Sequence, residues 1–584
     1  MKYTDQSNFD VVIMGAGFAG ICQARHLLLN IPGIRIALID PRPEDRQDRD
    51  MKVGESMVEI GALFVCKELG LQDYLIENHA PKYGLSFHWP KSPNKSTSLE
   101  DYFHVWANRQ THITSFHINR AVFERDVLKM VKQMGAVHYQ GAVTDVDLTP
   151  GDGAKTVYVN TEQACLRLQT DHVIDAAGRN FIIGRKTDNL LRGPEHLYGV
   201  NNGASWMRVR NVDRKIFHDG YAPEGVSVVS RYYATNHWFG QGHWIWMIPT
   251  TTDTMELSVG LVHHHKVISS DQVSTSEKFL KFLEANHNLL YRIVTSGEQV
   301  DFVHWPQIAH RSKKMFSEDN WYVLGDAAYV LDGFYSYGTT TIALAAESIT
   351  EIIRAKRAGE ADVEEKRCIY NDFNLAYARG VNLLIREHDK QLGNASIMSW
   401  RVYFEFMWWF SVHIPMYIGK WHLNKMYARK FTKIISGNID RFFPDLYAQF
   451  NQLVESEANI GIMDCYRADQ LLGDYTPLKF HDDFLINTKL EPLRCNVFAG
   501  MKKGYLYIAL WYLKFQWKAF KGIGLLKPRR IGFLFRLLGL SLSSAIAERV
   551  YKHKMRGVPS NSIVAKMREE FNRNYRYSNE LPPW

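Results

Sequence analysis

The sequence predicts an α/β fold with a nucleotide-binding domain, an inserted β-rich domain and a C-terminal helical domain. Three observations support this: an apolar strand that enters a glycine-rich turn near the N-terminus, aromatic strand-like segments in mid-chain, and long helical periodicity after residue 345. With 584 residues and 46% hydrophobic content, the chain can bury more than one core. We place the first module at 1–390, with its β-rich insertion near 80–120 and 190–310, and the helical domain at 391–584.

The N-terminal segment carries the order of elements that a dinucleotide site requires. Residues 9–14 form an apolar strand, residues 15–20 read Gly-Ala-Gly-Phe-Ala-Gly, and a helix-compatible stretch follows. The first glycine permits a tight turn, the second lets backbone approach a pyrophosphate, and the third allows close helix packing. A second strand ends at Asp40, placed to accept hydrogen bonds from a ribose. This pattern predicts dinucleotide binding; the alternative is a glycine turn without a ligand.

Two later segments favour FAD over NAD. Residues 173–179 return to a second glycine turn, and the strand at residues 321–324 ends in Gly325-Asp326 before small residues. In a Rossmann-type fold of the aromatic-hydroxylase (GR2) kind, an aspartate at such a strand end meets the ribityl chain and pyrophosphate. The alternative for Gly325-Asp326 is a helix cap that follows a strand.

Six motifs between Phe9 and about Glu347 occur together in one order. They are the glycine turn, Lys52-Val53-Gly54-Glu55-Ser56, Lys82 ahead of Phe87-His88-Trp89, Trp244-Ile245-Trp246-Met247-Ile248-Pro249, Gly325-Asp326, and Ser336-Tyr337-Gly338. In these motifs the sequence resembles the flavin-dependent halogenases.

The resemblance implies a reaction and a set of site residues. FAD, reduced by a separate flavin reductase, and O2 convert chloride or bromide to hypohalous acid, which Lys82 transfers to an aromatic substrate. Backbone N–H groups of Tyr337 and Gly338 are implied to bind the halide. The implied tunnel-lining residues are Trp244, Trp246, Phe87, Tyr335 and Ser336. The implied cofactor-binding residues are Gly15, Gly17, Phe18, Ala19, Gly20, Asp40, Gly54, Glu55, Ser56, Arg120, Gly325, Asp326 and Gly338.

Two positions depart from the family pattern. Halogenases of free tryptophan have glutamate just before the serine, where this chain has Tyr335. We therefore expect an electron-rich phenol or pyrrole, free or tethered to a carrier protein. The family usually has proline where this chain has Gly333. This favours the main alternative, an FAD-dependent monooxygenase that does not use halide; a third hypothesis is a non-catalytic flavoprotein that binds a carrier protein or a membrane.

The net charge of +8 is concentrated at one end of the chain. Residues 501–584 contain 17 Lys and Arg against 4 Glu and no Asp. Basic and apolar residues alternate between Lys502 and Arg556, which predicts contact with an acidic acyl carrier protein or the surface of a bilayer. The alternative is a solvated basic helix face. We expect no nucleic-acid binding, because no recognition fold accompanies the charge.

Cysteine spacing and the N-terminus bear on location. The six cysteines contain no CxxC pair and no metal-binding spacing, so we expect no metal site and a reducing, cytoplasmic environment. The N-terminus lacks a signal-peptide pattern, and no continuous apolar run has the length of a membrane span. We expect a cytoplasmic protein, with peripheral membrane contact as the alternative.

Overall fold

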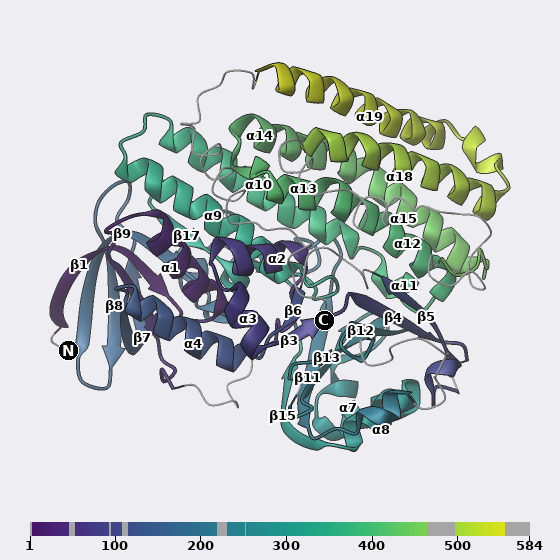
Figure 1. Cartoon of the computed structure of the whole chain (residues 1–584), viewed down its shortest axis with the longest axis horizontal. Coiled ribbons are helices and arrows are strands. Elements are labelled where there is room, and N and C mark those ends of the chain that lie inside the picture. Colours follow the sequence, from purple (N-terminus) through teal and green to yellow (C-terminus); the bar gives the residue numbers. More distant parts are fainter. Residues whose placement is uncertain are drawn as a thin grey trace.

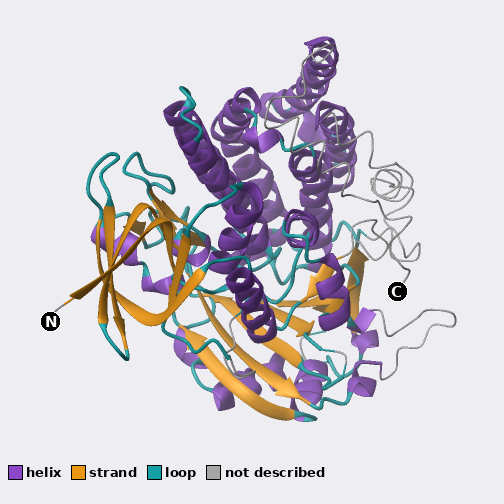
Figure 2. Cartoon of the chain, turned by 60° about the vertical axis from the view of Figure 1, so that its left-hand side comes forward, coloured by secondary structure: helices purple, strands orange, loops and turns teal. Residues whose placement is uncertain are grey.

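The computed structural model describes residues 3–45, 53–92, 95–107, 115–218, 231–251, 253–463 and 497–554. Lys52, Cys465, Cys495 and Arg556 lie outside the described residues. Two large sheets form one side of the molecule and a bundle of helices forms the other (Figures 1 and 2). The predicted α/β class with a helical C-terminal region is confirmed.

The N-terminal part of the chain forms a six-stranded sheet, in the order β1-β2-β7-β8-β9-β17, with β1 also paired to β9. Its central strands are parallel, because β1 pairs parallel with both β2 and β9, whereas β8 pairs antiparallel with β7 and β9. α1 and α4 pack on each other beside this sheet (Figure 1). The elements are β1 (Tyr3–Met14), α1 (Phe18–Asn30), β2 (Ile36–Asp40), α4 (Arg120–Gln133), β7 (Val137–Asp147), β8 (Lys155–Thr161), β9 (Cys165–Asp175) and β17 (Trp321–Val323).

A seven-stranded sheet, in the order β15-β11-β14-β13-β12-β4-β5, lies to the lower right of the first in Figure 1. It draws strands from both segments that the sequence assigns to the insertion, because β12 pairs parallel with β4 through Thr235 and Leu85. Its strands are β4 (Leu85–Pro90), β5 (Tyr102–Ala107), β11 (Asn202–Arg210), β12 (Thr235–Gly240), β13 (His243–Pro249), β14 (Leu257–His264) and β15 (Glu298–Trp305). α7 (Ser276–Asn286) and α8 (Asn288–Thr295) cover its outer side.

Small elements connect these sheets. They are α2 (Glu59–Leu63), α3 (Gln72–Asn78), β3 (Ala80–Lys82), β6 (Ser115–His117), α5 (Ile182–Lys186), β10 (Leu190–Leu191), β16 (His310–Ser312) and β18 (Tyr329–Val330). β3 and β6 form a two-stranded sheet in which Lys82 pairs with Ser115.

The helical region begins at α9, directly after the Ser-Tyr-Gly turn. Its helices are α9 (Tyr337–Arg357), α10 (Val363–Leu384), α11 (His388–Gln391), α12 (Ala395–Trp408), α13 (Ile414–Ile418), α14 (Lys425–Ile434), α15 (Asp440–Glu455), α18 (Val497–Phe520) and α19 (Pro528–Lys554). One continuous apolar core joins these helices to the six-stranded sheet, and α11 spans the predicted boundary at residue 390. The helical region is therefore packed into the nucleotide-binding unit and does not form a separate core.

One helix of the described chain meets the length and composition of a membrane span, at Pro528–Val550 within α19. Only 17% of its most apolar window is buried in the structure. The sequence predicts a helix of mixed basic and apolar residues in this segment, but it predicts no membrane span, because basic residues interrupt the apolar run.

Candidate functional site

The glycine turn between β1 and α1 leaves no room for side chains at two of its positions. Gly15 has a φ of +105°, and a Cβ on it would lie 2.4 Å from the carbonyl oxygen of Ala176. A Cβ on Gly20 would lie 1.9 Å from the carbonyl oxygen of Gly15. Around Gly17, the N-cap of α1, the nearest atom to a Cβ would be 3.6 Å away, on Arg42. The turn is thus closed toward the protein and open toward a ligand.

A cavity of about 990 Å³ extends from this turn. Gly15, Gly17, Phe18, Ala19 and Asp40 line one end, and Gly20 lies behind the wall. Further lining residues include Arg42, Arg120, Ala177, Gly178, Arg179 and Asp326. A second cavity, of about 190 Å³, shares Val53, Trp206, Trp305 and Asp326 with the first. The two together form one elongated site from the glycine turn to the start of α9.

The residues of the large cavity fit a flavin dinucleotide. The N-terminus of α1 faces it, and Arg42 and Arg120 stand beside that end, where the pyrophosphate of a dinucleotide carries its charge. Asp40 lies where the sequence predicts it. However, its carboxylate already accepts hydrogen bonds from the N–H of Ala16 at 2.8 Å and from three N–H groups of Arg42 at 2.9–3.0 Å. A ribose contact would require Arg42 to move, and it stays a prediction.

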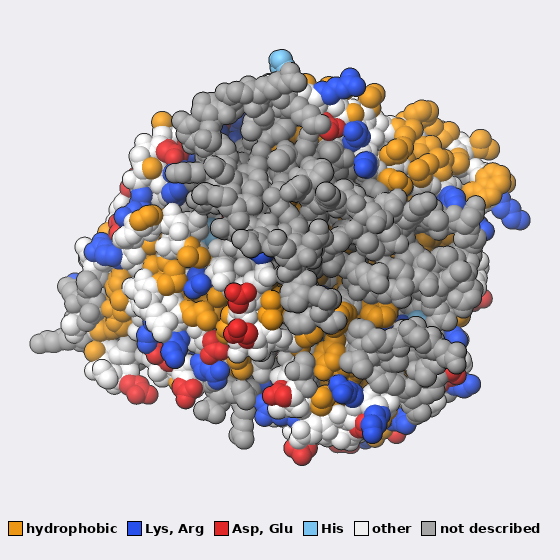
Figure 3. Space-filling model, viewed as in Figure 1, with side chains coloured by type: hydrophobic (Ala, Val, Ile, Leu, Met, Phe, Trp, Pro, Cys, Tyr) orange, Lys and Arg blue, Asp and Glu red, His pale blue; other side chains and the backbone are white. Residues whose placement is uncertain are grey.

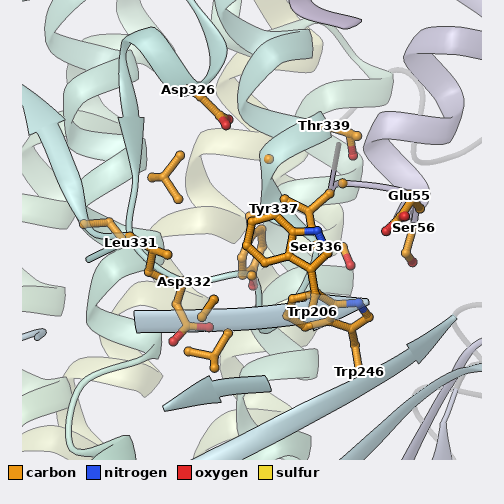
Figure 4. Close-up of a pocket in the computed structure, with 18 of the residues that line it drawn as sticks. Glu55, Ser56, Trp206, Trp246, Asp326, Leu331, Asp332, Ser336, Tyr337 and Thr339 are labelled. Atoms are coloured by element: carbon orange, nitrogen blue, oxygen red, sulfur yellow. The ribbon is translucent and has the colours of Figure 1, made fainter. Parts of the chain in front are cut away.

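The start of α9 lines the small cavity, with Ser336 and Tyr337 above Trp206 and Trp246 in Figure 4. Ser336, the N-cap, has a φ of +55° in the left-handed region, a strained conformation for this residue. Tyr337 and Gly338 stand in the first helical turn, whose N–H groups have no partner within the helix. A Cβ on Gly338 would meet no atom within 4 Å. The first turn of α9 therefore has open space beside Gly338 at the positive end of a helix dipole, a favourable place for an anion.

Two indoles from β13 line the small cavity, and each is held by a hydrogen bond. Trp244 donates from Nε1 to Oδ1 of Asp332 at 3.0 Å. Trp246 donates to Ser258 Oγ at 3.1 Å, and Ser258 donates to Oε2 of Glu55 at 2.9 Å. Burial raises the pKa of both carboxyls, Asp332 and Glu55, to about 7. The predicted strap residues Gly54, Glu55 and Ser56 line the same cavity.

Lys82 stands one side chain behind the wall of this cavity. Its Nζ donates to Ser56 Oγ at 2.9 Å and to the carbonyl oxygen of Met57 at 2.7 Å, and the residue is only 9% exposed. Ser56 and Thr235 both line the cavity, and their hydroxyl oxygens are 2.8 Å apart. Burial lowers the pKa of Lys82 to about 8, and the carboxylate of Glu59 opposes that shift. A buried ammonium with such a pKa can exchange its proton near neutral pH.

Two residues predicted to line the tunnel do not line either cavity. Phe87 is fully buried behind His237, with ring centroids 5.0 Å apart, and His237 takes the lining position. Tyr335 turns away from the cavity, and its hydroxyl donates to Glu405 of α12. The contact of these two side chains with the tunnel stays a prediction, because a strand or turn puts only some of its side chains on a given face.

The structure also adds lining residues that the sequence analysis missed. Trp206 of β11 and Trp305 of β15 cross edge to face at 4.8 Å, and both border the junction of the two cavities. On the far side of Lys82, Glu59 accepts a hydrogen bond from Trp409 Nε1 at 2.8 Å. No local sequence pattern points to Trp206 or to Glu59, because each reaches the site through contacts between distant segments.

Two groups of side chains in the described structure have ligand atoms within 4.8 Å of one another, as a metal ion would need. In the first, His264 and His388 meet Asp332, but the carboxylate of Asp332 already accepts hydrogen bonds from Trp244, Asn202 and Phe334. The second contains His26, Glu68 and Glu347, and the ammonium of Lys420 contacts both carboxylates at 2.7 Å. The absence of a metal site stays a prediction.

Comparison with known proteins gives a consistent result. The family model described as tryptophan halogenase matches residues 104–388. The chain is 39% identical to the flavin-dependent halogenase chlA of Dictyostelium discoideum, over 99% of both chains. It is 26% identical to the 1H-pyrrole-2-carbonyl-[peptidyl-carrier protein] chlorinase of Pseudomonas fluorescens, over 57% of this chain and 73% of the other. The crystal structure of halogenase PltM with phloroglucinol and FAD has the same fold, with a TM-score of 0.57 at 16% identity over 85% of this chain and 96% of that one.

Proposed function

This chain belongs to the flavin-dependent halogenases, and we propose that Lys82 is the residue through which it halogenates an electron-rich aromatic. The observation that carries this proposal is the place of the Lys82 ammonium. It lies directly behind Ser56 in the cavity that the tryptophans of β13 and the N-terminus of α9 enclose. The described residues that line the cavity include no lysine, so Lys82 reaches it only past Ser56.

Different residues of this chain have different roles in the proposed reaction. Bound reduced FAD would supply two electrons to O2, and the oxidant so formed would take two more from halide to give hypohalous acid. The first amides of α9, at Tyr337 and Gly338, hold the halide. The indoles of Trp244 and Trp246 separate the substrate from the flavin-binding cavity. Two N–H bonds of Lys82 are engaged with Ser56 and Met57, and the third is available to hold and polarise hypohalous acid.

A phenol or a pyrrole is the substrate class that the site supports best. The lining is mainly aromatic and aliphatic, which suits a flat apolar ring. The neighbouring Tyr335 position holds no glutamate to stabilise a poorly activated ring. One similar structure contains phloroglucinol, a phenol, and two relatives are named for pyrrole substrates on a peptidyl carrier protein. These support an activated ring, free or carrier-tethered.

Halogenation with and without halide tests the proposal. Full-length protein, FAD, NADH and a flavin reductase are incubated with a panel of phenols, with bromide or without halide, and products are measured by mass spectrometry. We expect bromide-dependent products that fall by about 100-fold or more in Lys82→Met, as for loss of a proton-donating group. Lys91→Met, which replaces an exposed lysine in the same part of the chain, is the control.

The outcomes separate the alternatives. Oxygenated product without halide would identify a monooxygenase and reject halogenation. Equal bromination by wild type and Lys82→Met would reject the role of Lys82 alone.

We also propose the partners that the reaction needs. A separate flavin reductase supplies reduced FAD, because the described chain has one glycine-turn dinucleotide site and that site fits FAD. We propose a cytoplasmic location, where such reductases and NADH meet, with contact to the membrane surface through the basic segment from Lys502 onward.

A further inference from the structure

We propose that the hairpin of α18 and α19 is a membrane-docking element that lies in the surface of a bilayer containing anionic lipids. This inference does not depend on the chemistry of the active site. α19 runs along α18 at the outer edge of the helical region (Figure 1). Its inner face is packed: Phe533 and Leu537 are buried, and the Phe533 ring lies 4.6 Å from Tyr512 of α18.

The opposite face of α19 is also apolar, although it faces outward. Phe535, Leu538, Leu542 and Ile546 follow one another at spacings of three or four residues, so they form a single stripe. Their exposed fractions are 67%, 40%, 65% and 56%. A surface helix of a soluble domain carries polar side chains on this face, so a second apolar stripe indicates a second apolar contact.

The tip of the hairpin also carries exposed apolar side chains, with lysines beside them. Trp517 at the end of α18 and Ile523 and Leu526 in the turn are 68%, 70% and 76% exposed. Lys521 and Lys527 flank them. Hydrophobic side chains gather over this end of the molecule in Figure 3, with basic side chains at its border. Tryptophan beside lysine is the combination that proteins favour at the boundary between lipid headgroups and acyl chains.

The positive charge of the hairpin favours an anionic bilayer over a second copy of the chain or a carrier protein. Residues 497–554 contain twelve Lys and Arg against one Glu and no Asp. A second copy of the chain would bring this positive charge against itself. An acidic carrier protein would match the charge but would leave the stripe and the tip in water. An anionic lipid surface satisfies both, since headgroups attract the basic residues while the apolar stripe enters the acyl boundary.

The contacts of α19 with α18 indicate that it lies in the surface rather than across the membrane. Ser541 Oγ donates to the carbonyl oxygen of Lys502 at 2.7 Å, and the ammonium of Lys502 is 2.9 Å from the carboxylate of Glu548. Arg530 donates to the side chain of Gln516 at 3.2 Å. Crossing a bilayer would break these polar contacts or carry them into hydrocarbon.

Docking in this orientation keeps the membrane close to the active site. Tyr505 of α18 packs on Trp408 at 5.4 Å, and the next residue, Trp409, packs on Tyr337 at 5.2 Å. One helical layer therefore separates the docked hairpin from the first turn of α9.

Vesicle sedimentation of the full-length protein tests the inference. Phosphatidylcholine vesicles are compared with vesicles that also contain phosphatidylserine. The stripe variant Leu542→Gln/Ile546→Gln and the tip variant Trp517→Ser/Leu526→Ser are compared with wild type. Met426→Gln is the control, because Met426 is a 45% exposed apolar residue on α14, outside the hairpin. We expect the wild type to bind the mixed vesicles and salt to weaken that binding. We expect the partition coefficients of the stripe and tip variants to be reduced by about tenfold or more.

Three results would overturn the proposal: no sedimentation with the mixed vesicles, equal sedimentation of the stripe variant and wild type, or sedimentation that Met426→Gln lowers as much as the stripe variant.

Other outcomes would assign the hairpin to a different partner. If the protein does not bind vesicles but forms an oligomer in sedimentation velocity, and the stripe variant dissociates it, the stripe is a contact between copies. Binding of an acidic acyl carrier protein in place of vesicles would assign the hairpin to carrier docking. Bromination of a water-soluble phenol should be unchanged in the stripe variant, so failure of docking and failure of the proposed halogenation are distinguishable.

Discussion

At the scale of single residues, the protonation of Lys82 gives the site a definite pH dependence. Burial lowers the pKa of Lys82 to about 8, so its ammonium form dominates at neutral pH and is lost as the pH rises through 8. If the ammonium holds hypohalous acid by hydrogen bonding, halogenation should fall above pH 8. Product formation at saturating reduced flavin, measured from pH 6.5 to 9.5, checks this. A rate that rises through pH 8 would show that the neutral amine reacts instead, as a haloamine.

Gly333 does not need to be glycine for conformational reasons. A Cβ at this exposed position would make ordinary contact, 3.6 Å from the Trp244 ring, and its φ lies outside the left-handed region. We therefore expect Gly333→Ala to leave the bromide KM within about twofold and to change the free energy of unfolding by no more than about 1 kcal/mol, in the stabilising direction. Steady-state bromination and urea denaturation measure these quantities. A large loss of halide dependence in Gly333→Ala would assign this position a direct part in halide binding.

At the scale of elements, a substitution in the first turn of α9 should change halide binding without lowering the stability of the fold. Gly338 stands in that turn beside open space, so Gly338→Ala would cover a backbone amide while adding a better helix former. We expect the bromide KM to rise about fivefold or more, with the free energy of unfolding unchanged or up to about 1 kcal/mol higher. Gly359→Ala, past the far end of the same helix at a φ of +66°, should instead lower stability and leave the bromide KM unchanged. An unchanged KM in Gly338→Ala would remove this amide from the halide site.

Elements with local signals were predictable, and contacts between distant elements were not. The glycine turn and the strand of Trp244 and Trp246 follow from short patterns, and the structure puts them where the sequence predicts. Trp206, by contrast, reaches the site only because β11 pairs with β14 and β15, a pairing that no short pattern specifies. The outward stripe of α19 was hidden for another reason. Helical periodicity shows that a helix has apolar faces, but it does not show which of them the rest of the chain covers.

At the scale of the whole molecule, Glu347 ties α9, the first helix of the helical region, to the helices beyond residue 390. This carboxylate, buried in α9, accepts hydrogen bonds from the Tyr417 hydroxyl at 2.6 Å, the Lys420 ammonium at 2.7 Å and the His422 ring at 2.9 Å. Burial raises its pKa, but Lys420 and His422 outweigh burial and hold the pKa of Glu347 well below its usual range. The stability that this carboxylate contributes should be fully present above the usual carboxyl range and lost as the pH falls below it.

Replacing this single carboxylate should therefore weaken the whole fold. We expect Glu347→Gln to lower the free energy of unfolding by about 3–5 kcal/mol, because it breaks a buried ion pair and leaves Lys420 short of a counter-charge. Glu318→Gln, which removes a surface partner of Lys314, should cost less than about 1 kcal/mol. Urea denaturation followed by circular dichroism and by tryptophan fluorescence measures both. Since one continuous core spans residue 390, the two signals should change together in wild type and in Glu347→Gln. Separate transitions would show that the helical region unfolds independently of the sheet that holds the flavin.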